Sequence, residues 1–273
     1  MGEKTRGRLL IIGGAEDKTG PCLILRFFIE LAGGDKAVVA LITTATESPR
    51  QVAGEYRELF LQLGAAEVIH LDVSDRVAAR SLRLTDRLTD VTGIFLTGGD
   101  QLRLTSILGG TSVSKWLHAA VRRGAVLAGT SAGAAAMTHI MIVSGREESA
   151  PKRSSVRLAP GLGFLEEVVV DQHFAERGRI GRLLAVVAQN PHILGLGLDE
   201  DTAVKCDPTG FFTVIGSGAC TVVDGLTIGH SNVSDSGVGE PLALTQVTVH
   251  VLPAGYSFNL DGRKPGLADS TMD

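Results

Sequence analysis

A serine lies between small residues at the point where an apolar run ends. Residues 125–128 read Ala-Val-Leu-Ala, residues 129–133 read Gly-Thr-Ser-Ala-Gly, and residues 134–137 read Ala-Ala-Ala-Met. The apolar run predicts a buried strand, and the alanines favour the start of a helix. Where a strand turns abruptly into a helix, the middle residue sits on a strained corner, and the close backbone approach requires small neighbours. The pattern therefore predicts a strand–turn–helix with Ser131 as a candidate nucleophile, although G-x-S-x-G also occurs by chance in glycine-rich turns.

Short apolar runs alternate with helical patterns along the first half of the chain. The predicted strands lie at 8–12, 37–42, 68–71, 93–97 and 125–128, and the predicted helices at 21–32, 48–64 and 113–122. Continuously apolar strands separated by helices indicate an α/β fold, a mostly parallel central sheet with helices on both faces.

The pattern changes after Ser131. Residues 144–163 are polar and predict a long surface loop, and a helix is expected over 175–189. Further strands are predicted at 168–170, 194–198, 202–206, 211–215, 219–223 and 242–251. Glycine and aspartate turns between the later runs predict an antiparallel, β-rich extension over about 202–260, and the tail after about 260 is expected to be mobile. No break in composition separates a second domain, so residues 1–273 are expected to form a single α/β domain.

Composition excludes several classes of function. A formal charge of −4, a pI near 6.0 and 4% aromatic residues argue against a nucleic-acid-binding protein. No apolar run approaches the roughly 18 residues of a membrane span. Three cysteines without a C-x-x-C pattern suit a reducing compartment and offer no metal framework, and no signal-peptide pattern precedes the first strand. We therefore expect a cytoplasmic protein that uses no metal.

A serine hydroxyl needs a base to take its proton, and the base needs a carboxylate to orient it. Of the seven histidines, His173 stands out because it follows the apolar run 168–170 at the end of a predicted strand. Ligands of doubly wound sheets bind at the carboxyl ends of strands, so we expect His173 and Ser131 to meet at one edge of the sheet. Glu200 is our choice of carboxylate, although spacing alone does not separate it from Asp199 or Asp201. A histidine merely hydrogen-bonded at a strand end, and an acidic surface turn, are the alternatives.

Backbone amides should complete such a site by forming an oxyanion hole. Gly99 follows the predicted strand 93–97 and Ala132 follows the serine, so their amides are the expected donors. Residues 13–18, Gly-Gly-Ala-Glu-Asp-Lys, match neither a dinucleotide-binding motif nor a phosphate-binding loop. No nucleotide cofactor is therefore expected.

Four motifs in this order resemble the cyanophycinase family of dipeptidase E-like serine peptidases, whose fold is similar to that of class I glutamine amidotransferases. They are Phe-Leu-Thr-Gly-Gly-Asp-Gln at 95–101, Gly-Thr-Ser-Ala-Gly-Ala at 129–134, Asp-Gln-His-Phe at 171–174 and Gly-Leu-Asp-Glu-Asp-Thr-Ala at 197–203. The resemblance extends from residue 13 to about residue 255. It implies Ser131 as nucleophile, His173 as base and Glu200 as the carboxylate that orients it.

The resemblance also implies a substrate and the residues that contact it. The substrate is cyanophycin, a poly-aspartate backbone whose β-carboxyls carry arginine through amide bonds, cleaved by an exopeptidase into β-Asp-Arg dipeptides without a cofactor. Its implied contacts are Gln101, Asp171, Gln172, Arg177, Arg179 and Arg182. On a helix Arg179 and Arg182 would share a face and could clamp a carboxylate, whereas solvated or helix-pairing charges, such as Glu176 with Arg179, are the alternative.

A homodimer is implied as well. An α-aspartyl dipeptidase with the same chemistry, and a non-catalytic binding protein on the same scaffold, are the competing functions.

Overall fold

The structure is a computed structural model that describes residues 7–80, 88–145, 150–153 and 155–267. Its helices are α1 (Leu23–Leu31), the 3-10 helix η1 (Gly34–Lys36), α2 (Pro49–Gln62), α3 (Arg76–Ala79), α5 (Gln101–Leu108), α6 (Ser112–Arg122), α7 (Ala132–Ala136) and α8 (Ile180–Gln189). The first nine strands are β1 (Leu9–Ile12), β2 (Val38–Ile42), β3 (Glu67–Leu71), β4 (Gly93–Leu96), β5 (Val126–Thr130), β6 (Ile140–Gly145), β7 (Val156–Pro160), β8 (Val168–Gln172) and β9 (Leu194–Leu198). The remaining strands are β10 (Thr202–Cys206), β11 (Phe211–Gly216), β12 (Ala219–Asp224), β13 (His230–Ser231), β14 (Leu244–Thr245), β15 (Thr248–Pro253), β16 (Tyr256–Asn259) and β17 (Lys264–Leu267).

A nine-stranded sheet runs in the order β17-β16-β11-β10-β1-β5-β4-β2-β3. Its β1, β5, β4, β2 and β3 pair in parallel, as continuously apolar strands joined by helices should. From β10 onward every neighbouring pair is antiparallel. The α/β fold with a parallel core and a β-rich C-terminal extension is therefore confirmed.

A second sheet, of four strands in the order β15-β12-β9-β8, was not predicted. Strands β8 and β9 pair in parallel there and share no ladder with β5. The expectation that Ser131 and His173 meet at the edge of one sheet was therefore wrong, because β5 and β8 belong to different sheets. The chain returns from β9 to the large sheet through the turn at 199–201, after which β10 pairs with β1.

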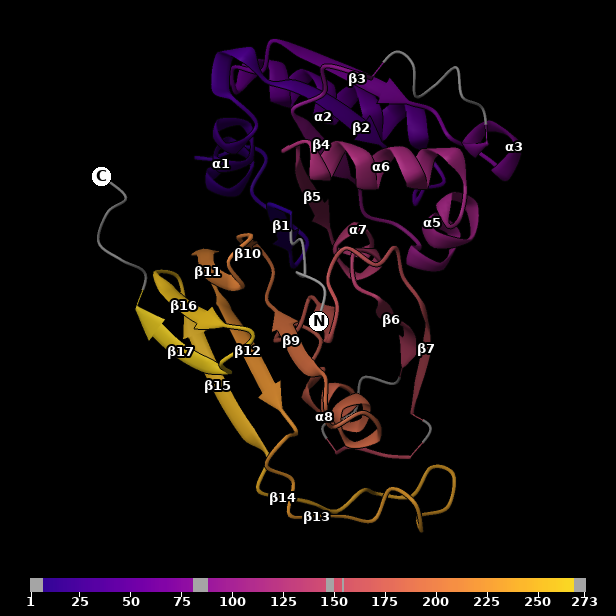
Figure 1. Cartoon of the computed structure of the whole chain (residues 1–273), viewed down its shortest axis with the longest axis vertical. Helices are drawn as coiled ribbons and strands as arrows, with labels where there is room; N and C mark the ends of the chain where they lie inside the picture. Colours follow the sequence, from indigo (N-terminus) through magenta and orange to yellow (C-terminus); the bar gives the residue numbers. More distant parts are fainter. Residues whose placement is uncertain (1–6, 81–87, 146–149, 154, 268–273) are drawn as a thin grey trace.

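The two sheets and their helices form successive layers (Figure 1). One face of the large sheet packs against α1 and α2, where the rings of Phe28, Tyr56 and Phe60 pack against the ring of Phe95. The other face shares a core with α5, α6, α7 and one face of the small sheet. Helix α8 covers the opposite face of the small sheet. Where the two sheets approach each other, each sheet is therefore covered on both faces.

The segment after Ser131 differs from the expected long loop. Strands β6 and β7 pair antiparallel within 140–160, while residues 146–149 and 154 lie outside the described residues. Helix α8 begins at Ile180 rather than near residue 175. The tail that was expected to be mobile contributes β17, which pairs with β16, and residues 268–273 lie outside the described part.

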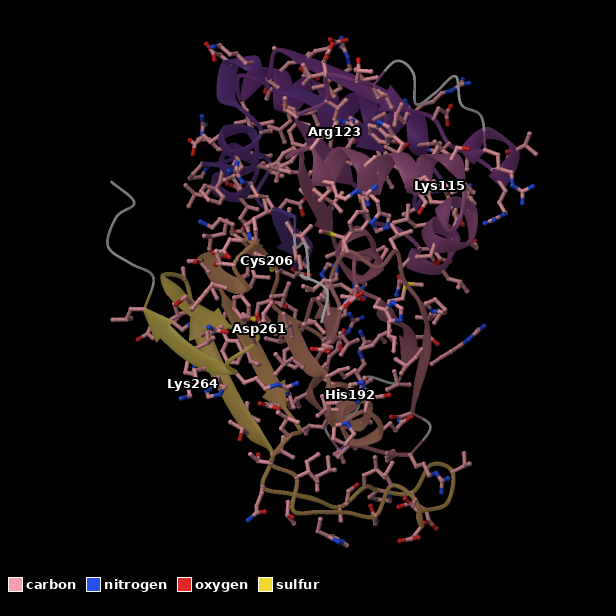
Figure 2. The ribbon with its side chains drawn as sticks, viewed as in Figure 1. Lys115, Arg123, His192, Cys206, Asp261 and Lys264 are labelled. Atoms are coloured by element: carbon pink, nitrogen blue, oxygen red, sulfur yellow. The ribbon has the colours of Figure 1, made fainter. Side chains whose placement is uncertain are left out.

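Figure 2 labels three exposed residues, of which Lys115 belongs to α6, Arg123 follows it directly and Lys264 belongs to β17. Among the described residues, no helix combines the length and the apolar composition that crossing a membrane requires.

Two glycines in helices offer a test of the packing around the turn after β5. A β-carbon at Gly133 would overlap the carbonyl oxygen of Leu96, whereas one at Gly54 in α2 would meet open space. We expect Gly133→Ala to lower the free energy of unfolding by about 1–3 kcal/mol through overpacking. Gly54→Ala, the matched control, should raise it by roughly 0.5–1 kcal/mol, because alanine loses less backbone entropy in a helix. Urea denaturation measures both, and equal stability of the two variants would contradict this account of the turn.

Candidate active site

Ser131 occupies the sharp corner between β5 and α7. Its backbone angles, φ 51° and ψ −110°, lie in a region that residues other than glycine rarely adopt. Its amide donates a hydrogen bond to the carbonyl of Ile12 in β1 at 3.0 Å. Strain of this kind costs about 1–3 kcal/mol and persists where neighbouring structure fixes it. The predicted strand–turn–helix is present, and it presents the hydroxyl at the end of β5.

His173 follows β8 and lies between the other two residues of the predicted triad. Its Nε2 is 2.9 Å from Ser131 Oγ, and its Nδ1 is 2.6 Å from Glu200 Oε1. The imidazole side chain is 12% exposed and the Glu200 side chain 37% exposed. The structure therefore brings together the serine, histidine and glutamate that the sequence analysis selected.

The partners of the imidazole fix its hydrogen-bonding roles. An ionised carboxylate can only accept, so Nδ1 carries the proton that is shared with Glu200. Nε2 is then the acceptor for the Ser131 hydroxyl. This arrangement can take a proton from the serine as its oxygen attacks an electrophile.

The three neighbouring acids after β9 have separate hydrogen-bonding partners. The Asp199 carboxylate accepts hydrogen bonds from the Ala175 amide at 3.1 Å and the Ala219 amide at 3.0 Å. Asp201 accepts from the Asp17 amide at 2.9 Å and from Ser217 Oγ at 2.9 Å. Glu200 alone of the three reaches His173, which spacing in the sequence could not decide.

Other histidines have different surroundings. His70 Nε2 lies 2.8 Å from Thr43 Oγ1, and burial lowers the pKa of this imidazole. His118 hydrogen-bonds to the Leu162 carbonyl and stacks on Phe164. His192, labelled in Figure 2, precedes the amino end of β9, whereas Glu200 follows its carboxyl end. Among the hydrogen bonds and ring contacts of the described residues, none joins these three imidazoles to Ser131.

Gly99 follows β4 and Ala132 follows Ser131 directly, and their amides are the oxyanion-hole donors that the sequence analysis expects. Gly99 has φ 138°, and a β-carbon there would collide with the carbonyl oxygen of Ala45, so only glycine fits. The Ala132 amide begins α7 directly after the serine. Among the described residues, neither amide donates a hydrogen bond to another protein group. The residue before Gly99 lies near the serine, since a β-carbon on Gly98 would be 3.5 Å from Ser131 Cβ.

Three of the predicted substrate contacts are instead buried and pair with one another. Asp171 is fully buried, and Arg182 Nε donates to its Oδ2 at 2.6 Å while Arg182 Nη2 bonds its Oδ1. Arg179 Nη1 lies 3.5 Å from the same carboxylate and also bonds the Gln172 carbonyl. Arg179 and Arg182 therefore do not form an exposed clamp, which corrects the sequence-based picture.

Glu176, the alternative partner named for Arg179, accepts a hydrogen bond from the Glu200 amide at 3.2 Å. Arg177 is exposed, and Gln172 is buried with its Oε1 atom without a hydrogen-bond partner in the described structure. Gln101 begins α5 and donates its side-chain amide to the carbonyls of Ile142 and Val143 at 2.8 and 3.1 Å.

The sequence analysis missed a buried cluster next to the serine. Glu16 hydrogen-bonds to Thr130, the residue before Ser131, and to Tyr56 in α2. The available signal was an acid shortly after the apolar run 8–12, within a segment that matches no nucleotide-binding motif. No group of three or more histidine, cysteine, aspartate or glutamate side chains among the described residues is placed to hold a metal ion.

The Asp171 cluster makes a prediction about stability. Asp171→Asn removes the carboxylate and leaves the buried Arg179 and Arg182 guanidinium groups short of negative charge, which should cost about 3–5 kcal/mol of unfolding free energy. Arg177→Gln, at an exposed position, should change it by less than about 0.5 kcal/mol. Chemical denaturation of both variants checks this. An Asp171→Asn protein as stable as the wild type would return Asp171 to the role of a free substrate contact.

Known proteins are similar to this chain over most of its length. Residues 9–214 match peptidase family S51. A cyanophycinase of Trichormus variabilis is 42% identical over 259 residues, covering 94% of this chain and 87% of the relative. A cyanophycinase of Geminocystis herdmanii is 39% identical over 266 residues, covering 97% and 98%.

Two solved structures share the fold. A peptidase from an acI-B1 Actinobacterium has a TM-score of 0.70 at 21% identity, covering 94% of this chain and 98% of that one. A putative peptidase E protein from Listeria monocytogenes has a TM-score of 0.53 at 15% identity, covering 78% and 99%.

Proposed function

The chain belongs to peptidase family S51, and on that premise we propose that it is a serine exopeptidase that degrades cyanophycin to β-Asp-Arg dipeptides. The observation that carries the proposal is the pair of hydrogen bonds from Ser131 through His173 to Glu200 at a strained corner. The cyanophycinases that cover most of the chain at about 40% identity supply the substrate class.

The first half of the proposed reaction forms an acyl-enzyme. Ser131 Oγ attacks the carbonyl carbon of an aspartyl residue in the polymer backbone, and His173 Nε2 takes the hydroxyl proton. The carbonyl oxygen becomes an oxyanion and is held by the amides of Gly99 and Ala132. Collapse of this intermediate breaks the peptide bond, and His173 gives its proton to the departing amine. Glu200 stabilises the imidazolium that exists between the two transfers.

Water completes the cycle. His173 takes a proton from a water molecule as its oxygen attacks the acyl carbon, and a second oxyanion forms in the same place. Its collapse releases the carboxylic acid and returns the proton to Ser131. All proton transfers in the proposed cycle involve residues of the chain, water and the departing amine, so it requires no cofactor.

The predicted substrate contacts fall into two groups, those that touch the polymer and those that hold the site in place. We assign Gln101, Gln172 and Arg177 to direct contact with the polymer, whose carboxylates and guanidinium groups call for both a cation and amide groups. The buried carboxylate of Asp171 and its two arginines are assigned to holding the end of β8, and thus His173, in place. This revises the expectation that these three residues bind substrate charges.

A homodimer in the cytoplasm is part of the proposal. Strand β15 is an edge of the small sheet, and its Val249 and Val251 are 46% and 64% exposed. An exposed apolar edge strand is a surface that a second copy could cover.

Replacement of the nucleophile tests the mechanism. Ser131→Ala should lower turnover of cyanophycin by about four to six orders of magnitude while the protein remains folded, because residual rate then comes from binding and the oxyanion hole alone. Ser106→Ala, an exposed serine in α5, is the matched control and should keep full activity. Release of dipeptide measured under saturating substrate reports the effect. If the Ser131 variant kept most of its turnover, the nucleophile would have to be sought elsewhere.

Product analysis tests the substrate. Incubation of the protein with purified cyanophycin in the presence of a chelator should release β-Asp-Arg, identified by mass, and Asp-Leu should be a much poorer substrate. Rapid hydrolysis of Asp-Leu with cyanophycin left intact would instead favour an α-aspartyl dipeptidase. Failure to hydrolyse either, combined with failure of a fluorophosphonate to label Ser131, would favour a binding protein on this scaffold.

A further inference from the structure

The segment that follows β1 contacts every stretch that carries a member of the triad. The carbonyl of Gly13 accepts a hydrogen bond from the His173 amide, and the carbonyl of Gly14 accepts one from the Asp201 amide, both at 2.9 Å. At the end of β1 itself, the Ile12 carbonyl accepts from the Ser131 amide. Residues 13–22, here termed the β1–α1 loop, therefore bridge the two sheets at the site.

Gly14 in this loop also confines the imidazole. Its φ is 104°, and a β-carbon would lie 2.5 Å from His173 Nε2, so the glycine α-carbon is packed against the ring edge that faces Ser131. A shift of the loop by a fraction of an ångström would open or close the space in which the ring sits. The position of the loop thus bears directly on the distance between Nε2 and the serine oxygen.

Glu16 fixes this loop to the large sheet. Its side chain is 1% exposed, and its Oε2 accepts a hydrogen bond from Thr130 Oγ1 at 2.5 Å. The hydroxyl of Tyr56 donates to Oε1, and burial together with the Glu16 carboxylate raises the pKa of Tyr56, so the phenol stays protonated and remains a donor. Lys18 Nζ lies 3.8 Å from Oε1 and 4.4 Å from the centre of the Tyr56 ring. The carboxylate therefore has two hydroxyl donors and a neighbouring ammonium group.

The hydrogen bonds from Thr130 and Tyr56 hold Glu16, here termed the anchor, where it can affect the nucleophile. Thr130 is the last residue of β5 and is bonded covalently to Ser131, while Tyr56 belongs to α2 on the outer face of the sheet. Because the Glu16 side chain is buried, it cannot touch a polymeric substrate. Any effect of Glu16 on the reaction must pass through the residues that it holds.

We propose that Glu16 is a positioning residue: through its hydrogen bond with Thr130 it holds the β1–α1 loop in the register that keeps His173 within reach of Ser131. The inference rests on the proposed function for the reaction that it assists. It assigns a role to the acid in the Gly-Gly-Ala-Glu-Asp-Lys segment that neither the triad nor substrate recognition uses. Its effect belongs to the chemical step rather than to substrate affinity.

Removal of the Thr130 hydroxyl is the sharpest test, since valine keeps the shape of threonine and leaves Glu16 in place. We expect Thr130→Val to lower kcat on cyanophycin about tenfold and to change KM by no more than about twofold. A small misplacement of the reacting groups reduces the stabilisation of the transition state and leaves the binding of the substrate unchanged. The rate of Ser131 labelling by a small fluorophosphonate should fall by the same factor. Thr130→Ser restores a hydroxyl and should restore both rates.

Thr111→Val is the matched control for lost stability. Thr111 is a buried threonine at the start of α6 whose Oγ1 donates to the Leu108 carbonyl at 2.6 Å, and its replacement also removes a buried hydrogen bond. It should lower the melting temperature and leave kcat and the labelling rate unchanged per folded molecule.

The outcomes separate the anchor from the proposed function. If the wild type reacts and Thr130→Val reacts equally fast, or if Thr130→Val raises KM with kcat intact, the positioning role is overturned and the peptidase remains. If Thr111→Val loses as much activity as Thr130→Val, general destabilisation replaces the anchor as the explanation. A wild type that neither cleaves cyanophycin nor reacts with the fluorophosphonate overturns the proposed function and the positioning role together. If the fluorophosphonate labels Ser131 but the protein does not cleave cyanophycin, only the proposed substrate is contradicted. The labelling rates of the variants then still decide the role of Glu16.

Discussion

The backbone hydrogen bonds at the end of β1 are the contacts on which the rest of the site depends. Ser131 follows a strand of the nine-stranded sheet and His173 follows a strand of the four-stranded sheet, so no shared ladder sets the distance between them. Gly13 accepts from His173 and donates to the Thr202 carbonyl at 2.8 Å, which joins the end of β8 to the start of β10 through one residue. A side chain on Gly13 would overlap the Asp199 carbonyl, so glycine allows the two sheets to approach this closely.

Strain at the site is concentrated in residues that these bonds hold. Ser131, His173 and Asp201 adopt φ of 51°, 48° and 45°, although none is glycine. Each such conformation costs about 1–3 kcal/mol in isolation and is maintained only where the surroundings determine it. Their amides donate to the carbonyls of Ile12, Gly13 and Gly14, three consecutive residues of one strand end and its loop. The same short segment therefore stabilises all three strained turns, and rigidity at the site follows from its attachment to the centre of the large sheet.

Much of the fold could be predicted from the sequence, because local patterns determine single elements. The runs at 194–198 and 202–206 gave the bounds of β9 and β10, and the small residues around Ser131 gave the turn into α7. The division into two sheets could not be predicted, because strand pairing is decided by contacts between distant residues. Helix α5 was missed since Gly98 and Gly99 indicate a loop, while the Asp100 side chain that caps the helix follows directly. Arg179 and Arg182 were expected to clamp a substrate carboxylate, and only the fold reveals Asp171 beside them.

The selection of Glu200 from three adjacent acids has a physical reason that the structure supplies. Asp199 and Asp201 have a shorter side chain than Glu200. The carboxylate of each accepts hydrogen bonds from amides or a hydroxyl near the turn between β9 and β10. Those bonds fix the turn that crosses between the sheets. Glu200 has one more methylene group and reaches the imidazole of His173 at 2.6 Å while its own amide is held by Glu176. Two short acids thus hold the backbone so that the longer one can orient the base. The order serine, histidine, glutamate differs from that of α/β-hydrolases, yet the geometry of the three groups is of the same kind, because proton transfer depends on where these atoms lie and not on where they occur in the chain.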